Sequence, residues 1–119
     1  MGGQAVMEKL YGKEYADTVI KRLNDLNPEF ARIALEIGYD QFWARSVLST
    51  REKSLLTIAA LIAQGREEQT KIHMRGFLES GGKLIELEEA LLHLIVYCGF
   101  PASMTAFTHL NAVKTDMGL

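Results

Sequence analysis

A histidine, His73, lies on the apolar side of the helix that the sequence predicts over residues 67–80, and imidazole is well suited to proton transfer near neutral pH. Gln69 precedes it by one helical turn and Phe77 follows it by one, so the three side chains share a face. Such a histidine can act as a general acid or base, or can serve the core as a structural residue with one hydrogen bond. Helical geometry alone favours the structural role.

The other two histidines give weaker indications of chemistry. His93 shares the one polar stripe of its helix with Glu86 and Glu89, which favours a surface salt bridge. His109 lies at helical spacing among apolar residues and is a second candidate for a buried histidine, with no motif around it. The three histidines fall on three different helices, without the paired Asp or Glu that marks a metal centre, so we expect no metal site.

The composition limits the classes of protein to which the chain can belong. Its 119 residues, 48% hydrophobic and 24% charged, fit one compact domain over residues 1–119. The net charge of −2 gives no basic field for nucleic acid, and the longest apolar run, residues 91–100, is too short to cross a membrane. Because the N-terminus lacks the apolar core of a signal peptide, we expect a soluble cytoplasmic protein. The single cysteine, Cys98, leaves no intramolecular disulfide or dithiol motif.

Apolar residues recur at three- and four-residue steps along the chain, which predicts helices and no strand. Asn27-Pro28 is typical of a helix start, as cap and first helical residue, and Pro101 marks the start of the last helix. Ser49 and Glu52 fit a capping box. We expect an all-α fold of six or seven helices. The clearest cover residues 50–64, 67–80, 86–98 and 101–117, and the first, second and last of these end at Gly65, at Gly81 or Gly82, and at Gly118.

Two of these helices are apolar on most of their faces. The segments LLTIAALIA, residues 55–63, and LLHLIVYC, residues 91–98, present few polar positions. A chain of this size has too few neighbouring helices to cover both readily, because small domains bury a smaller fraction of their surface. We therefore expect a homo-oligomer, and a monomer with a tight six-helix core is the alternative.

Three segments together resemble the carboxymuconolactone decarboxylase family. They are SLLTIAALIAQGR at residues 54–66, KIHMRGFLESGG at residues 71–82 and VYCGFPASMTAF at residues 96–107, in the order and spacing of that family. The segment YGKEYAD, residues 11–17, is similar to the short helical lead-in of its members. The resemblance implies an alkylhydroperoxidase D-like helical domain that assembles into rings, hexamers or trimers, with the active site near the histidine helix and a subunit interface.

The departures from the alkylhydroperoxidase D branch of this family concern the redox residues. Members of that branch carry Cys-x-x-Cys-x-x-x-His, preceded by a glutamate that helps to deprotonate a cysteine. His73 matches their histidine, but the cysteine positions hold Arg66 and Gln69, and the glutamate position holds Ser54. The dithiol peroxidase route is therefore absent. Ser54 and the missing cysteines match the decarboxylase branch, and Cys98 is most simply a small buried hydrophobe.

The decarboxylase branch implies a lyase without a cofactor, acting on 4-carboxymuconolactone or a similar small carboxylated lactone from the degradation of aromatic compounds. Such a lactone can lose carbon dioxide because the electron pair left behind spreads through the ring double bond onto the lactone carbonyl. His73 is the candidate general acid that returns a proton to a ring carbon, since the unperturbed pKa of histidine lies near neutrality. The candidate substrate-binding residues are Gln69, Arg66 and Ser54.

These polar residues also have alternative roles. Gln69 can donate its amide to a substrate oxygen, or can only fix the tautomer of His73. Arg66 can hold a carboxylate through two hydrogen bonds if it turns inward, or can remain solvated. Arg75 points away from His73 within one chain, so only a neighbouring subunit could bring it into the same pocket.

Two classes of function stay open on this reasoning. The first is the lyase, with His73 as its general acid. The second is a non-redox helical oligomer of the same fold that binds a small ligand or a partner, because a fold does not fix a reaction. A peroxidase-like antioxidant protein without the dithiol motif is a third alternative. It is disfavoured because the two cysteines of the dithiol route are missing.

Overall fold

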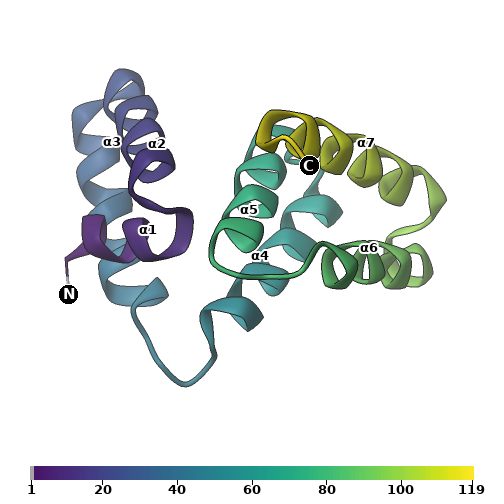
Figure 1. Ribbon diagram of the computed structural model, residues 1–119. Helices are drawn as coiled ribbons and strands as arrows, with labels where there is room; N and C mark the ends of the chain where they lie inside the picture. The colour runs from purple at the N-terminus through teal and green to yellow at the C-terminus, as the bar shows by residue number, and fades with distance from the viewer. Residues whose placement is uncertain (1) are drawn as a thin grey trace. The chain divides into compact units, whose positions relative to one another are not determined.

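The computed structural model describes residues 2–119, and within them it contains seven α-helices, one π-helical segment and no strand (Figure 1). The prediction of an all-α fold of six or seven helices is confirmed. The chain divides into two compact units, residues 1–50 and 51–119, which are described in turn. That residues 1–119 form a single domain stays a prediction.

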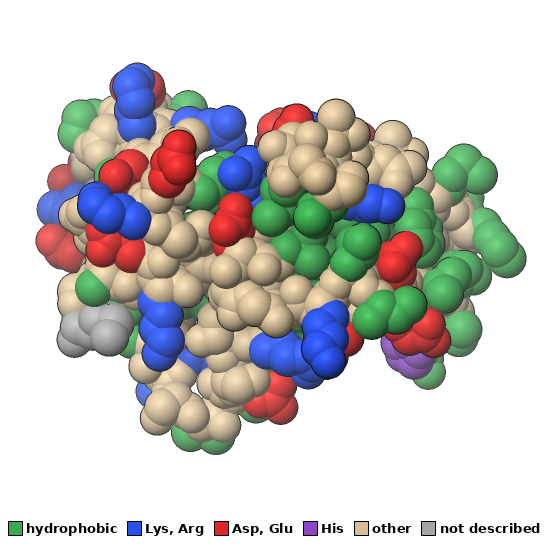
Figure 2. Space-filling view, viewed as in Figure 1, with side chains coloured by type: hydrophobic (Ala, Val, Ile, Leu, Met, Phe, Trp, Pro, Cys, Tyr) green, Lys and Arg blue, Asp and Glu red, His purple; other side chains and the backbone are tan. Residues whose placement is uncertain are grey.

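The first unit packs four helical segments around a small apolar core. Helices α1 (Gly3–Tyr11), α2 (Lys13–Leu26) and α3 (Pro28–Ile33) lead into the π-helical segment η1 (Ala34–Trp43). α1 lies against both α2 and η1. Acidic and basic side chains are interspersed over the face of this unit that Figure 2 shows. Its buried apolar residues lie mainly on α1 and α2: Val6, Met7, Leu10, Tyr11, Ala16, Val19 and Ala31.

A cluster of aromatic rings joins the segments of this unit. Tyr11 ends α1, and after a turn at Gly12, where φ is +78°, the chain continues as α2. The Tyr11 hydroxyl lies 2.8 Å from the Tyr39 hydroxyl of η1, and its ring meets the Tyr15 ring edge-on. Burial raises the pKa of both Tyr11 and Tyr39. The segment YGKEYAD at residues 11–17 is therefore a helix junction built around a buried tyrosine.

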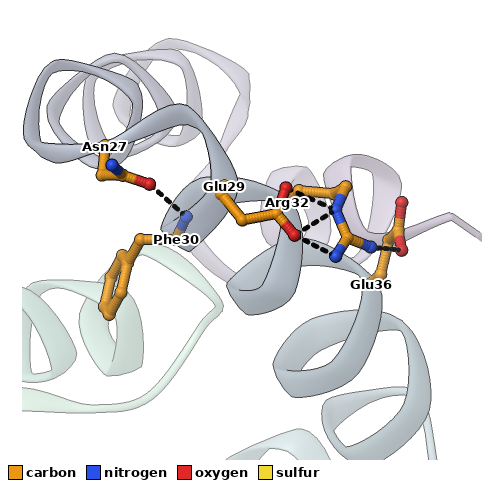
Figure 3. Close-up of polar contacts among 5 residues, drawn as sticks. All are labelled: Asn27, Glu29, Phe30, Arg32 and Glu36. Atoms are coloured by element: carbon orange, nitrogen blue, oxygen red, sulfur yellow. Dashed lines mark hydrogen bonds and ion pairs between the residues drawn. The ribbon is translucent and has the colours of Figure 1, made fainter.

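Helix α3 begins as the sequence predicts and is tied to η1 by one arginine (Figure 3). The Asn27 side-chain oxygen accepts a hydrogen bond of 2.9 Å from the Phe30 backbone N–H, and the proline that follows Asn27 opens the helix. Arg32 donates to Glu29 within α3 and, at 2.8 Å, to Glu36 in η1. These groups are exposed, so the ion pairs contribute little energy, but they link the two segments where the helix type changes.

The segment η1 departs from the α-helix that three- and four-residue spacing predicts. At its end the Ala44 N–H bonds the Tyr39 carbonyl at 3.1 Å, a five-residue step. None of its residues is fully buried, although Tyr39 is part-buried, so no fully buried apolar stripe imposes the 3.6-residue period on it. α1 also passes very near it, because a Cβ built on Gly3 would lie 2.1 Å from the Leu35 carbonyl oxygen.

The second unit is a bundle of four longer helices: α4 (Thr50–Gln64), α5 (Glu67–Glu79), α6 (Leu84–Cys98) and α7 (Phe100–Met117). The predicted ends agree with these bounds to within about two residues, the scatter usual for helix termini. Gly65, Gly81 and Gly118 have φ of +71°, +101° and +73°, which confirms glycines as the helix-ending residues. α7 packs on both α5 and α6. The core consists of Ile58, Ile62, Met74, Phe77, Leu87, Leu91, Ala106, Leu110 and Val113.

Gly82 gives a direct test of how tightly this core is packed. A Cβ built at Gly82 would lie 2.4 Å from the buried Phe77 ring, whereas one built at Gly38 meets nothing within 4 Å. Gly82→Ala should therefore force the ring to move and lower the free energy of unfolding by about 1–3 kcal/mol. Gly38→Ala should be neutral or stabilising by about 0.5–1 kcal/mol, because alanine loses less backbone entropy on folding. Urea unfolding measures both, and equal effects would contradict this packing.

Candidate functional site

His73 lies on the second turn of α5, at the edge of the face that this helix buries. Its neighbour Met74 and the residue one turn later, Phe77, are fully buried in the core, and His73 itself is part-buried. Burial lowers its pKa from the ordinary 6.5 to about 4. The pKa of His73 in the ligand-free protein thus lies below the unperturbed, near-neutral value of histidine. At neutral pH the imidazole is uncharged.

The three predicted binding residues lie in very different surroundings. Arg66 is exposed and caps the start of α5, where its carbonyl accepts a 2.7 Å hydrogen bond from the Thr70 hydroxyl. Gln69 is exposed. Ser54 on α4 is completely buried, and its hydroxyl has no hydrogen-bond partner within residues 2–119. Ser54 therefore lies inside the protein, while Arg66 and Gln69 face outward.

A pocket of about 450 Å³ opens where the end of α4, the start of α5 and the first half of α7 meet. Arg66 lines it, together with Glu67 and Thr70 of α5, whereas Gln69, His73 and Ser54 are not among its lining residues. The structure therefore brings Arg66 to a pocket that starts one to two turns before His73 on the same helix. The rest of the lining is mainly apolar or small: Leu61, Ile62, Ala63, Gln64, Gly65, Pro101, Ala102, Thr105, Ala106 and His109.

His109 is a further polar residue of this pocket, and the sequence assigned no role in a site to it. Its side chain is 16% exposed, which confirms the expectation of a largely buried histidine. Its Nε2 atom is buried without a hydrogen-bond partner in the part of the chain that the structure describes, and lies 3.9 Å from the Glu67 carboxylate. That distance allows electrostatic attraction but is too long for a hydrogen bond. Its place on the apolar face of α7 is the only sequence signal that could have pointed to it.

The remaining polar candidates lie away from this pocket. Glu86 binds Arg51 and accepts a 3.1 Å hydrogen bond from the Lys83 N–H. Within residues 2–119 His93 forms no ion pair with Glu86 or Glu89, so the expected surface salt bridge is wrong, and the His93 ring lies instead 5.4 Å from the Tyr97 ring. Hydrogen bonds from Arg51 and the backbone lower the pKa of Glu86.

Arg75 and Cys98 also lie outside the lining of this pocket. Arg75 lies 3.5 Å from Glu79 on its own helix. Cys98 is part-buried at the end of α6. The capping box of Ser49 and Glu52 stays a prediction. Within residues 2–119 no three His, Cys, Asp or Glu side chains lie close enough to hold a metal ion, and no helix is long and apolar enough to cross a membrane.

Comparison with known proteins identifies the family of the chain. The sequence profile of the Carboxymuconolactone decarboxylase family matches residues 28–112. A 4-carboxymuconolactone decarboxylase of Acinetobacter baylyi is 32% identical, with 98% of this chain and 87% of the relative aligned. The nitrosuccinic acid decarboxylase npaB of Metarhizium robertsii is 28% identical over 97% of this chain and 80% of its own length. Peroxisomal protein 2 of Schizosaccharomyces pombe is 30% identical over 82% of this chain and 47% of its own length.

The resemblance of the three sequence segments is thus confirmed by matches that run well beyond them, from the first helices of the chain to its last. Because the family profile covers most of the sequence and a named relative aligns with nearly all of it, this chain belongs to the carboxymuconolactone decarboxylase family.

Proposed function

We propose that the protein is a carboxy-lyase that needs no cofactor and removes one carboxyl group from a small lactone of the 4-carboxymuconolactone type. The observation that carries the proposal is the 32% identity to a 4-carboxymuconolactone decarboxylase along 98% of the chain. The similarity to a nitrosuccinic acid decarboxylase supports decarboxylation as the type of reaction. His73, at the position of the family's histidine, is the proposed general acid.

The acids in these two names share a chemical pattern that defines the substrate class. In each, the carboxyl group that leaves is attached to a carbon beside an electron-accepting group, which is an unsaturated lactone in one acid and a nitro group in the other. In each, the same carbon also carries a CH2–COOH group, so that a second carboxyl group stays on the product. The proposed substrate is therefore a small dicarboxylic acid with a built-in electron acceptor.

The reaction is balanced without an oxidant or a reductant. The bond between the ring carbon and the leaving carboxylate breaks, and its electron pair moves through the ring double bond onto the lactone carbonyl oxygen while carbon dioxide departs. The electron pair then returns to a ring carbon, which takes up one proton. The protein accelerates this sequence by stabilising the negative charge on the lactone oxygen and by supplying the proton.

The lowered pKa of His73 suits it to the second of these steps. In the free protein burial keeps the imidazole neutral. Binding of a dianionic substrate beside it raises its pKa and draws a proton from solution, because an anion stabilises the charged imidazolium. Once carbon dioxide has left, the buried imidazolium is a strong acid, and transfer of its proton to the ring carbon restores the neutral state that burial favours. His73 thus cycles between protonated and neutral forms.

The enzymatic proposal is tested by incubating the purified protein with 4-carboxymuconolactone and following the loss of its ultraviolet absorbance. His73→Gln should lower kcat by about 10²–10⁴-fold, because the proton donor is lost. His93→Gln, which removes an exposed imidazole on α6, is the matched control and should turn over like the wild type. No turnover by the wild type, or equal turnover by the wild type and His73→Gln, would contradict the proposal.

The neutral state of His73 in the free protein should also make the free energy of unfolding depend on pH. Unfolding restores its ordinary pKa of 6.5, so between pH 6.5 and about 4 the unfolded chain binds a proton that the folded protein does not. Stability should therefore fall as the pH drops through this window, by up to about 3 kcal/mol from this residue alone. His73→Gln should remove that part of the pH dependence in urea unfolding, and His93→Gln should not. An unchanged slope in His73→Gln would refute the burial argument.

We also propose that the protein works as a homo-oligomer, a trimer or a hexamer. An apolar patch supports this proposal, because Leu92 and Val96 at the end of α6 and Phe100 and Met104 at the start of α7 are 48–74% exposed. Figure 2 shows hydrophobic side chains gathered over this turn between the two helices. A patch of this kind on a soluble chain is typical of an interface.

Light scattering at micromolar concentration should give a multiple of 13.3 kDa. Val96→Glu, which places a charge in the patch, should lower the measured mass, whereas Asn111→Glu at an exposed polar position of α7 should not. A wild-type protein that stays monomeric would contradict the oligomer.

A further inference from the structure

We propose that the pocket between α4, α5 and α7 binds the carboxylate that the substrate keeps, with Arg66 and His109 as its binding residues. This inference rests on the proposed function, because it assigns one end of the dicarboxylic substrate to a site away from the proton donor. It gives His109 a role in specificity, and it commits Arg66 to one of the two carboxylates.

The pocket combines a cation at its rim with an unsatisfied polar atom at its wall. Arg66 is exposed where it enters α5, so its guanidinium can turn toward a ligand without losing a buried contact. The Thr70 hydroxyl donates to the Arg66 carbonyl and holds that backbone in place. A guanidinium can bind a carboxylate through two parallel hydrogen bonds, which a single point charge cannot do.

His109 contributes a directed hydrogen bond from the other side. It comes from α7, it lines the same pocket, and its Nε2 atom is buried and has no hydrogen-bond partner among residues 2–119. A buried polar atom without a partner is costly, and a ligand that supplies the partner removes that cost. An imidazole with its proton on Nε2 can donate to a carboxylate oxygen while remaining uncharged.

Glu67 indicates which kind of group this position accepts. Its carboxylate lies 3.9 Å from His109 Nε2, and its side chain is 66% exposed, so the carboxylate can swing into water when a ligand enters. The protein thus already places a carboxylate near the unsatisfied nitrogen, although too far away for a hydrogen bond. A ligand carboxylate that comes closer would replace Glu67 there, and Glu67 acts as a weak internal competitor.

The electrostatics of decarboxylation decide which substrate carboxylate belongs beside Arg66. The leaving carboxylate loses its negative charge as carbon dioxide forms, so a cation holding it would stabilise the ground state more than the transition state and slow the reaction. The retained carboxylate keeps its charge throughout, so a cation beside it strengthens binding without that penalty. Arg66 also precedes His73 by seven residues, about 10 Å along a helix, which leaves room for the reacting carbon between them.

The test uses muconolactone, which keeps the lactone and the retained carboxylate but lacks the leaving carboxyl group, and its methyl ester, which lacks that charge. Protein with isotope-labelled histidine is titrated with each, and His109→Gln identifies the His109 signals. Muconolactone should shift these signals, and the ester at equal concentration should not. Arg66→Gln should weaken muconolactone binding about tenfold or more, with Arg66→Lys in between and Glu67→Gln binding more tightly. Lys71→Gln, on the same helix but not lining the pocket, should bind like the wild type.

The outcomes separate this inference from the proposed function. If the wild type decarboxylates 4-carboxymuconolactone but muconolactone leaves His109 unshifted, or binds Arg66→Gln as tightly as the wild type, the pocket assignment is overturned and the lyase stands. If the wild type does not decarboxylate that acid, yet muconolactone shifts His109 and depends on Arg66, the assignment holds and the proposed reaction falls.

Discussion

The burial of one face of α5 fixes where the α5 residues of the proposed site can lie. Thr70, Met74 and Phe77 follow one another at steps of four and three and are all buried, so the helix cannot rotate without exposing apolar surface. His73, next to Met74, is thereby held at the edge of the buried face. Arg66, before the first turn, is held at the rim of the pocket. The core thus positions both the proposed acid and the proposed anchor.

This placement separates two electrostatic requirements that conflict when they share one location. A proton donor that must become neutral again benefits from a dry environment, and burial of His73 provides one. A cation that holds a carboxylate needs freedom to reorient, and the exposure of Arg66 provides that. If Arg66 lay beside His73, its positive charge would oppose protonation of the imidazole. Two turns of helix let one element serve both purposes.

The sequence predicts this structure best where local chemistry decides it. Asn27 with the proline after it, Gly65 and Gly118 each act within a single turn, and the helix ends they predict are present. The sequence fails where the answer depends on contacts between distant segments. It could not show that His109 of α7 meets the start of α5, and it could not give the pKa of His73, because that value depends on what covers the imidazole. The three family segments placed His73 correctly on its helix, but no spacing rule reveals the pocket.

The π-helical segment η1 has a consequence for the length of the chain. Its turns close over five-residue steps, so each turn holds more residues than an α-helical turn of the same kind. Loss of one residue from Ala34–Trp43 can be absorbed by tightening a turn to the α form without breaking the helix, because none of its side chains is fully buried and only its part-buried ones, such as Tyr39, must be kept in place. This stretch is therefore a place where homologous chains can differ in length while the helices before and after it keep their own sequence register.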